Sequence, residues 1–235
     1  MPSRHRVGIV RFPGTNCDLD TWDAISLIPE LEPVWISHKD RQGEDLAALV
    51  LPGGFSYGDY LRTGIIAARA PVMEMVGSFA DRGRPVLGIC NGFQILAEAG
   101  ILPGTLLPNG GRTFLCQEES LVLENCRTPF TNLFLPGTPV TLPIAHQEGR
   151  YFIDPDQLQE IEKRGQILLR YLKNPNGSER EIAGVTNRSG NVVGLMPHPE
   201  RRVRTLFGRP DGLLFFRSLA LHLERQNSRA VQPIP

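Results

Sequence analysis

Lysine is scarce in this chain of 235 residues, and its scarcity excludes one class of nucleotide-binding site. The lysines are Lys39, Lys163 and Lys173, and none of them follows a glycine, as the lysine of a Walker A phosphate loop must. Neither sign of charge is in excess, because 25 Lys and Arg residues balance 25 Asp and Glu residues. We therefore do not expect nucleic acid or an anionic membrane to be the main partner.

Long hydrophobic runs are also absent. Arg69 and Glu74 interrupt the richest apolar stretch, and Asn91 and Gln94 interrupt the next, so no segment is expected to span a bilayer. The apolar run at residues 7–10 follows a basic N-terminus but is too short for a signal-peptide core, and it is typical of a strand. These features predict a cytoplasmic protein.

Patterns that hold disulfides or metal ions are missing as well. The four cysteines have no C-x-x-C spacing, and in a cytoplasmic domain they are expected to stay reduced. They are Cys17, Cys90, Cys116 and Cys126. Three histidines have no His or Cys partner at ligand spacing, so the sequence predicts no metal site. These are His5, His38 and His222.

The first half of the chain alternates short β-branched apolar runs with amphipathic stretches, which is typical of βαβ units in a mostly parallel sheet flanked by helices. Strands are predicted at residues 7–12, 33–37, 46–51 and 86–89. Helices are predicted at residues 18–27, 67–81 and 92–99. Asn16 is the candidate N-cap of the first helix, and Gly100 ends the third.

The second half has proline-rich turns and separated strands, which favour antiparallel additions to the sheet. Strands are predicted at residues 121–124, 140–145, 167–172, 182–186 and 192–196. Apolar residues at helical spacing predict a last helix at residues 211–225. The fold class is therefore α/β, in a single domain of residues 1–226 followed by a flexible tail at 227–235.

The segment from Pro85 to Gln94 is the most informative, because a strand runs through G-x-C-x-G into a helix. This is a nucleophile elbow with sulfur as the nucleophile. Gly88 and Gly92 leave room for a strained turn, and the N-terminus of the following helix favours the thiolate of Cys90. Cys90 is thus the candidate nucleophile, although a buried, inert cysteine would also fit this pattern taken alone.

A nucleophile needs a base, and the segment Met196-Pro197-His198-Pro199-Glu200 offers one. Residues before proline are extended, so His198 and Glu200 are expected on the same side, where the carboxylate orients the imidazole. His146 is the competing candidate, but no prolines bracket it. We expect His146 to be a substrate-side or structural residue.

Attack on a carbonyl also needs hydrogen-bond donors for the oxyanion. The turn Leu51-Pro52-Gly53-Gly54-Phe55 follows a predicted strand and is expected at the same sheet edge as the elbow. The backbone N–H groups of Gly54 and Asn91 are the candidate oxyanion-hole donors.

Together these residues resemble those of class I (triad) glutamine amidotransferases, and more closely the glutaminase subunits of phosphoribosylformylglycinamidine synthases. The motifs that carry the resemblance are Gly88 to Gln94, Pro52 to Phe55 and Pro197 to Glu200, with Arg11 to Asp18, Gly53 to Arg62 and Asn174 to Ser178 for the closer match. The resemblance implies a flavodoxin-like amidotransferase fold over nearly the whole chain. Gln147 departs from it, since the family often has glycine after the histidine.

The resemblance implies that Cys90 cleaves the glutamine side-chain amide through a thioester, with His198 moving protons, Glu200 orienting His198 and Gln94 helping to bind glutamine. The ammonia would pass to a large ATP- and Mg-using synthetase subunit, aided by a small third subunit, which makes formylglycinamidine ribonucleotide in purine biosynthesis. This chain itself would bind no cofactor. Residues 55–62, rich in aromatic and charged groups, are the candidate docking or gating surface for the partner.

Other functions remain open on the residues alone. The chain could be a glutaminase for a different acceptor, or a related cysteine hydrolase of small amides. It could also be a catalytically silent module that regulates a synthetase, although an intact set of Cys90, His198 and Glu200 argues against that.

Overall fold

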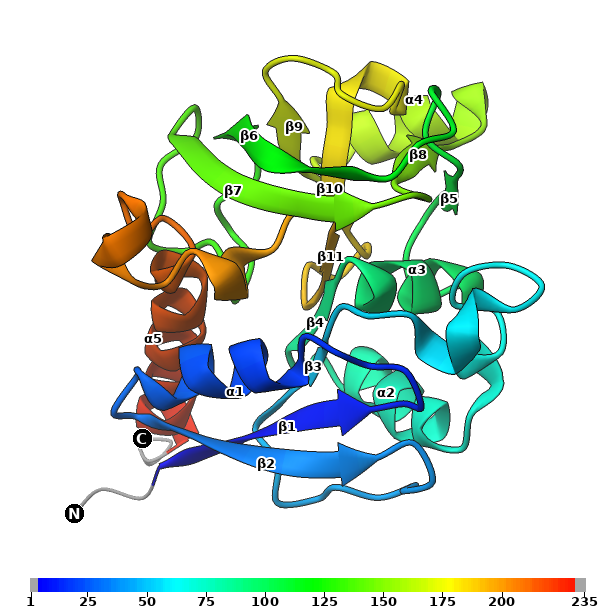
Figure 1. Cartoon of the computed structure of the whole chain (residues 1–235). Coiled ribbons are helices and arrows are strands. Elements are labelled where there is room, and N and C mark those ends of the chain that lie inside the picture. The colour runs from blue at the N-terminus through cyan, green and yellow to red at the C-terminus, as the bar shows by residue number, and fades with distance from the viewer. Residues whose placement is uncertain (1–3, 231–235) are drawn as a thin grey trace.

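A computed structural model describes residues 4–230, and one mixed sheet of nine strands lies at the centre of this part of the chain (Figure 1). Its strands are β1 (His5–Arg11), β2 (Leu31–Ser37), β3 (Ala48–Leu51), β4 (Val86–Ile89), β6 (Leu115–Leu123), β7 (Pro139–His146), β9 (Ile167–Tyr171), β10 (Ile182–Thr186) and β11 (Val192–Leu195). Their order across the sheet is β2-β1-β3-β4-β11-β10-β9-β6-β7. A separate antiparallel pair joins β5 (Thr105–Leu107) to β8 (Arg150–Phe152).

The sheet changes character at β11. The neighbours from β2 to β11 pair in parallel, whereas β10, β9, β6 and β7 are added antiparallel. Every residue of β3, β4 and β11 is buried, as expected for parallel strands that helices cover on both faces. The α/β fold predicted from the sequence, with a parallel first half and antiparallel additions, is confirmed.

Helices cover both faces of the parallel strands. They are α1 (Asp18–Ser26), α2 (Val72–Asp81), α3 (Asn91–Glu98), α4 (Pro155–Lys163) and α5 (Leu213–Ala230). In Figure 1, α1 and α5 lie on one side of the parallel strands, and α2 and α3 lie on the other. Short 3₁₀ turns occur at Ser56–Asp59, Ala67–Arg69, Glu179–Glu181, Pro199–Arg201 and Thr205–Phe207.

Some predicted elements differ from the observed ones. The helix expected at residues 67–81 is a 3₁₀ turn, Ala67–Arg69, followed by α2, because Ala70 before Pro71 is extended. The strand β6 begins at Leu115, whereas the predicted strand began at residue 121. The prediction started too late because the first residues of β6 are mostly exposed and polar and show no apolar pattern. Three elements, α4, β5 and β8, were not expected from the sequence.

The start of α1 and the end of α5 also differ from those expected. Asn16 is not the N-cap of α1: Cys17 holds that position without a side-chain cap, and the Asn16 Oδ1 accepts a hydrogen bond from Cys17 Sγ at 3.3 Å. The last helix, α5, continues to Ala230, beyond the predicted end at 225. Residues 231–235 of the expected tail lie outside the described residues.

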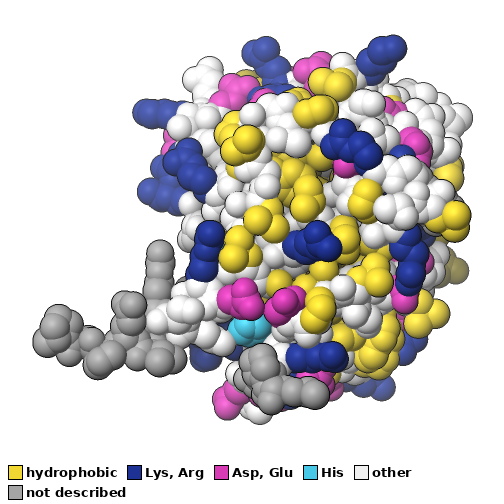
Figure 2. Space-filling view, turned by 90° about the vertical axis from the view of Figure 1, so that its left-hand side faces the viewer, with side chains coloured by type: hydrophobic (Ala, Val, Ile, Leu, Met, Phe, Trp, Pro, Cys, Tyr) yellow, Lys and Arg dark blue, Asp and Glu magenta, His cyan; other side chains and the backbone are white. Residues whose placement is uncertain are grey.

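The surface shows the balance of charges and the helices show the lack of long apolar runs that the sequence indicated. On the face drawn in Figure 2, Lys and Arg side chains are spread among acidic and apolar ones. Within residues 4–230, no helix is both long and apolar enough to cross a membrane.

Candidate active site

The carboxyl ends of four neighbouring parallel strands meet at one edge of the sheet. Beyond these ends come residues 12–17 after β1, 52–55 after β3, Cys90 after β4 and residues 196–200 after β11. Open α/β sheets bind their ligands at this edge. The topology therefore gathers segments that are far apart in the sequence.

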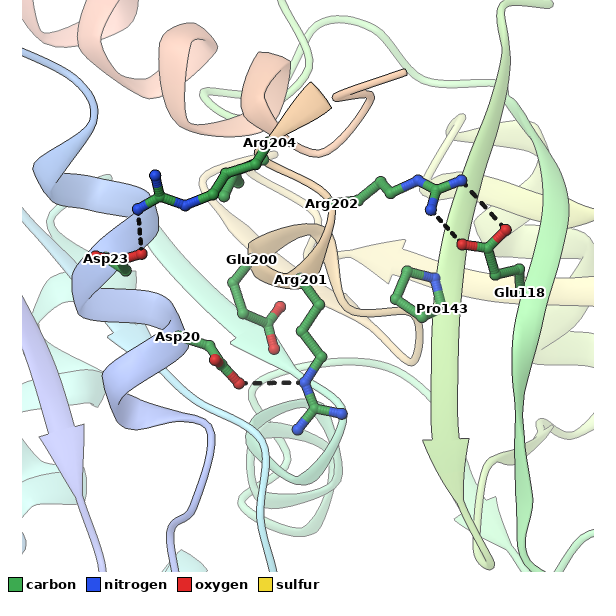
Figure 3. Close-up of a pocket in the computed structure, with 9 residues that line it drawn as sticks. Asp20, Asp23, Glu118, Pro143, Glu200, Arg201, Arg202 and Arg204 are labelled. Carbon is green, nitrogen blue, oxygen red and sulfur yellow. Dashed lines mark hydrogen bonds and ion pairs between the residues drawn. The ribbon is translucent and has the colours of Figure 1, made fainter. Parts of the chain in front are cut away.

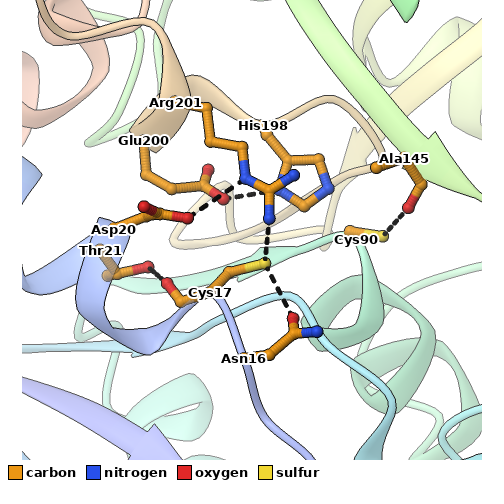
Figure 4. Close-up of polar contacts among 9 residues, drawn as sticks. All are labelled: Asn16, Cys17, Asp20, Thr21, Cys90, Ala145, His198, Glu200 and Arg201. Carbon is orange, nitrogen blue, oxygen red and sulfur yellow. Dashed lines mark hydrogen bonds and ion pairs between the residues drawn. The ribbon is translucent and has the colours of Figure 1, made fainter. Parts of the chain in front are cut away.

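Cys90 lies on a sharp turn between β4 and α3, with φ 50° and ψ −104°, a conformation that only a constrained non-glycine residue keeps. A Cβ on Gly88 would lie 2.7 Å from the carbonyl carbon of Gly92, and a Cβ on Gly92 would lie 1.9 Å from the carbonyl oxygen of Leu51. Only glycine fits on either side of Cys90. The thiol is buried and donates to the carbonyl oxygen of Ala145 at 3.6 Å (Figure 4).

His198 and Glu200 form a buried pair directly after β11. Nδ1 of His198 lies 2.6 Å from Oε1 of Glu200, and both side chains are almost fully excluded from solvent. The backbone N–H of His198 donates to the carbonyl oxygen of Pro143, which anchors the segment to β7. His198 and Glu200 thus face one another as expected, but Pro199–Arg201 is a 3₁₀ turn and not the extended segment on which the expectation was based.

The imidazole of His198 lies against the elbow. A Cβ on Gly53 would be 2.8 Å from Cε1 of His198 and 3.5 Å from Cβ of Cys90, so the missing side chain of Gly53 makes room for both. Nε2 of His198 has no hydrogen-bond partner among the described residues, and Figure 4 shows it on the side of Cys90. The structure therefore brings Cys90, His198 and Glu200 together.

The electrostatics of the group favour a protonated imidazole. Burial lowers the pKa of His198, but the carboxylate of Glu200 and the thiols of Cys90 and Cys17 raise it, and the resulting pKa lies well above its ordinary value. Proton transfer between His198 and a leaving amine is the chemistry that such an imidazole can do.

Sequence reasoning missed two members of this cluster, Cys17 and Arg201. The Sγ of Cys17 accepts a hydrogen bond from Nη2 of Arg201 at 3.0 Å, and the guanidinium also contacts Asp20 (Figure 4). Burial lowers the pKa of Arg201, but Cys17, Glu200 and Asp20 raise it overall. The sequence could have pointed to these two residues only through their positions. Cys17 belongs to the motif Arg11 to Asp18, which follows β1, and Arg201 directly follows Glu200.

The predicted oxyanion donors lie beside the nucleophile. Asn91 is the first residue of α3, where backbone N–H groups have no partner within the helix. Gly54 lines the same cavity as Cys90, and a Cβ there would lie 2.8 Å from the backbone of three residues, 14 to 16. The side-chain Oδ1 of Asn91 accepts from the N–H of Ser56 at 3.2 Å, which ties the glycine turn to the elbow.

Gln94 is buried rather than exposed, and it lines the cavity at Cys90. Its Oε1 accepts from Nδ2 of Asn91 at 3.0 Å, and its Nε2 donates to the carbonyl oxygen of Glu148 at 2.5 Å. Gln94 therefore joins α3 to the turn after β7 at the edge of the cavity.

His146 occupies this cavity too, but it is held as a neutral imidazole. Nδ1 lies 3.1 Å from Oδ1 of Asn109, which also accepts from the N–H of Gly149. Burial, and next the proximity of His198, lower the pKa of His146 to about 4. It has no carboxylate to orient it as Glu200 orients His198.

Cys17, His198 and Glu200 are also a candidate metal set within residues 4–230, since one ligand atom from each lies within 4.8 Å of the others. The guanidinium of Arg201 contacts Cys17 and places a positive charge beside this set. Such a charge disfavours a metal cation there. The absence of a metal site stays a prediction.

A second cavity, of about 590 Å³, touches Glu200 but not Cys90 or His198 (Figure 3). Three arginines line it, and each is paired with a carboxylate. The pairs are Arg201 with Asp20, Arg202 with Glu118 and Arg204 with Asp23. Because the nucleophile is not part of this cavity, it is not where amide cleavage would occur.

The fold and the arrangement at the sheet edge agree with a family comparison. A family model for the CobB/CobQ-like glutamine amidotransferase domain matches residues 4–210. The chain belongs to this class of glutamine amidotransferases.

Comparison with individual proteins identifies the family within this class of glutamine amidotransferases. The chain is 51% identical to the phosphoribosylformylglycinamidine synthase subunit PurQ of Rubrobacter xylanophilus, over 91% of this chain and 97% of the relative. It is 50% identical to that of Thermus thermophilus, over 94% and 100%. A chain in the structure of PurLQS from Thermotoga maritima matches with a TM-score of 0.86 and 45% identity, over 94% and 99%. The chain belongs to the PurQ family, the glutaminase subunits of phosphoribosylformylglycinamidine synthase, and the resemblance seen in the sequence is confirmed.

Proposed function

We propose that this chain hydrolyses glutamine to glutamate and delivers the ammonia to a synthetase that converts formylglycinamide ribonucleotide to formylglycinamidine ribonucleotide in de novo purine biosynthesis. The observation that carries the proposal is the meeting of Cys90, on its strained elbow, with the buried His198 and Glu200 pair. A nucleophile, a proton carrier and an orienting carboxylate are the parts that amide cleavage needs.

In the first half of the reaction, the Cys90 thiolate attacks the side-chain carbonyl carbon of glutamine, and a C–S bond forms. The oxyanion accepts hydrogen bonds from the N–H groups of Gly54 and Asn91. The C–N bond then breaks while His198 donates its proton to the leaving nitrogen, which departs as ammonia. A γ-glutamyl thioester remains on Cys90.

In the second half, neutral His198 takes a proton from water, and the water oxygen attacks the thioester carbonyl carbon. The C–S bond breaks, glutamate leaves and the thiolate returns. Glu200 orients the ring and stabilises its charged form in both halves. Gln94 helps to bind glutamine at the cavity wall.

Ammonia released into water would be protonated and lost, so the reaction needs an acceptor enzyme in contact with this chain. We propose a large PurL-type synthetase subunit, which binds ATP and Mg, and a small PurS-type subunit. The absence of a Walker A motif here is consistent with nucleotide binding by the partner. The reaction is proposed to take place in the cytoplasm.

The proposed docking or gating surface is residues 55–62, beside the cavity that contains Cys90. Phe55, Tyr60 and Leu61 are all exposed there, and Leu61 is 93% exposed. Exposed apolar groups at the mouth of a site mark an interaction surface. A synthetase that covers them would also close the cavity to water.

Covalent labelling tests the nucleophile. The full chain is treated with a glutamine-shaped diazoketone and digested, and the adduct is mapped by mass spectrometry. We expect modification at Cys90 and none in Cys90→Ser, with glutamine protecting. A Cys116→Ser variant controls for the exposed thiol at that position. An adduct at Cys17, Cys116 or Cys126 without one at Cys90 would overturn the mechanism.

Acceptor identity needs a separate measurement. The synthetase and small subunit are assayed for formylglycinamidine ribonucleotide with ammonium salts, and then with glutamine plus this chain. Glutamine should replace the salts only when this chain is present. If glutamine does not replace the salts although the labelling experiment modifies Cys90, the result would favour a glutaminase for another acceptor or a hydrolase of small amides.

A further inference from the structure

The carboxylate of Glu200 has only part of the pairing that a buried charge needs. Its Oε1 lies 2.6 Å from Nδ1 of His198, but its Oε2 is buried and has no hydrogen-bond partner among the described residues. The side chain is fully excluded from solvent, so water cannot stabilise its charge. A buried carboxylate is costly unless it is hydrogen-bonded and paired with a positive group.

The charges in the site change during the proposed reaction. Before attack, the thiolate of Cys90 and the carboxylate of Glu200 are both negative, and protonated His198 supplies one positive charge. After His198 has given its proton to the leaving nitrogen, Cys90 is acylated and uncharged, and Glu200 keeps a negative charge beside a neutral ring. In both states one positive charge is missing, and a fixed cation near Glu200 would supply it.

Arg201 is the cation that the fold places beside Glu200. It is the last residue of the 3₁₀ turn Pro199–Arg201, and its Nη2 donates to Sγ of Cys17 at 3.0 Å (Figure 4). That sulfur lies within 4.8 Å of a side-chain oxygen of Glu200 and of a ring nitrogen of His198. The guanidinium is therefore close to the buried pair without lining the cavity that contains the nucleophile.

Cys17 is well fixed as an acceptor for this guanidinium. Its backbone N–H donates to the carbonyl oxygen of Gly53 at 3.2 Å, and its carbonyl oxygen accepts from Oγ1 of Thr21 at 2.8 Å. Its thiol donates to Oδ1 of Asn16 at 3.3 Å, which leaves the lone pairs of the sulfur for Arg201. Cys17 thus holds the positive group in one place.

The charge of Arg201 acts on Glu200 more than on its surface partner. Burial lowers the pKa of Arg201, but Cys17, Glu200 and Asp20 raise it above its ordinary value. The side chain of Asp20 is 48% exposed, so water screens its charge, whereas that of Glu200 is fully buried. Asp20 therefore cancels only part of the positive charge.

We propose that Arg201 is a positioning residue for amide cleavage: held by Cys17, it balances the charge of Glu200 while His198 gives up and regains its proton. Glu200 then stays ionised and keeps the ring oriented in both states of the reaction. The inference rests on the proposed glutaminase function, and it adds to the reaction a residue that acts from outside the cavity at Cys90.

Arg201→Met tests the role in the complex with the synthetase subunits, because it removes the charge and keeps a long side chain. A charge beside a buried reacting pair is weakly screened, so we expect kcat for glutamine hydrolysis to fall about 10- to 100-fold, with KM within a few fold of wild type. Arg201→Lys keeps a positive charge and should recover most of the lost kcat.

Arg204→Met is the matched control. Arg204 lines the second cavity and pairs with Asp23 of α1, as Arg201 pairs with Asp20 of the same helix. Its substitution should leave both kcat and KM unchanged. Thermal unfolding of each variant checks that all of them fold.

Asp20→Asn separates the charge of Arg201 from a structural link between the 3₁₀ turn and α1. The substitution removes the carboxylate that accepts from Nε of Arg201 but leaves the contact with Cys17. If Arg201 acts by its charge, Asp20→Asn should keep kcat within a few fold of wild type. If the ion pair only fastens the turn to α1, Asp20→Asn should lower kcat as much as Arg201→Met does, and the proposal is wrong.

The outcomes distinguish two failures. If wild type hydrolyses glutamine but Arg201→Met keeps the wild-type kcat, or Arg201→Lys is no better than Arg201→Met, the role of Arg201 is wrong and the glutaminase function stands. A rise in KM at unchanged kcat would have the same meaning. If wild type in the complex does not hydrolyse glutamine, the proposed function itself fails, and the role of Arg201 with it.

Discussion

Gly92, the second residue of α3, lies directly against Leu51, the last residue of β3. A Cβ on Gly92 would be 1.9 Å from the carbonyl oxygen of Leu51 and 2.7 Å from its carbonyl carbon. This contact joins the elbow of Cys90 to the turn that carries Gly54. The segment that carries the nucleophile and the segment that carries a proposed oxyanion donor are therefore held together by a direct contact between their backbones.

Gly92→Ala should destabilise the protein severely. The methyl group meets backbone atoms that cannot rotate away, so strand and helix must separate, and we expect a loss of about 3 kcal/mol or more in the free energy of unfolding. Urea unfolding of the full chain measures it. Gly77→Ala in α2 is the matched control: apart from its chain neighbours and the backbone of its own helix, no atom would lie within 4 Å of the added Cβ, and alanine should be neutral or stabilise by up to about 1 kcal/mol. Equal effects at both positions would contradict this account of the elbow.

Glu200→Gln should lower kcat for glutamine hydrolysis by about 10²- to 10⁴-fold, because the imidazole loses the carboxylate that orients it and favours its charged form. Steady-state kinetics of the complex check it. Glu44→Gln, at an exposed residue that does not line the cavity, should leave kcat unchanged. If Glu200→Gln kept near-wild-type kcat, His198 would not be the proton carrier, and His146 would be tested next.

The stability of the fold should depend on pH through His198. Burial lowers its pKa and Glu200 and Cys90 raise it, and the folded-state pKa ends well above the unfolded one. Protonated His198 thus stabilises the fold, fully below the unfolded pKa of about 6.5, and the contribution disappears as pH rises through the folded pKa. The stability difference between wild type and His198→Asn, from urea unfolding at several pH values, should shrink as pH rises. A difference that grows with pH would contradict this.

Asp154→Ala should destabilise α4 without affecting catalysis. The side chain of Asp154 caps the helix by accepting from the N–H of Asp156 at 3.0 Å, and losing a cap costs about 0.5–2 kcal/mol. Thermal or urea unfolding measures the loss. Asp156→Ala removes a first-turn charge but leaves the cap, so it should cost less, about 0.3–1 kcal/mol. The reverse order would show that charge rather than capping begins this helix.

Local patterns predicted much of the fold. The strands β4 and β10 have the bounds expected from the sequence, because short β-branched runs between turns specify a strand with little help from elsewhere. The helix α4 could have been predicted from Asp154-Pro155, an N-cap followed by proline. It was not predicted because most of its residues are polar and only Leu158 and Ile161 are apolar and buried. The first half of β6 could not have been predicted in this way, since residues 116–118 are exposed in succession and show no alternation of buried and exposed positions.

The amino-acid sequence by itself determined the nucleophile elbow, the His198 and Glu200 spacing and the positions of most strands along the chain, because each depends on neighbours a few residues apart. Only the tertiary structure decided that Cys17 contacts Arg201, that Gly53 makes room for His198, and that Asp59 faces Glu148 across a cavity. These contacts join strand ends and turns from distant parts of the chain. They exist because parallel pairing of β1, β3, β4 and β11 brings those ends to one edge, which no local pattern encodes.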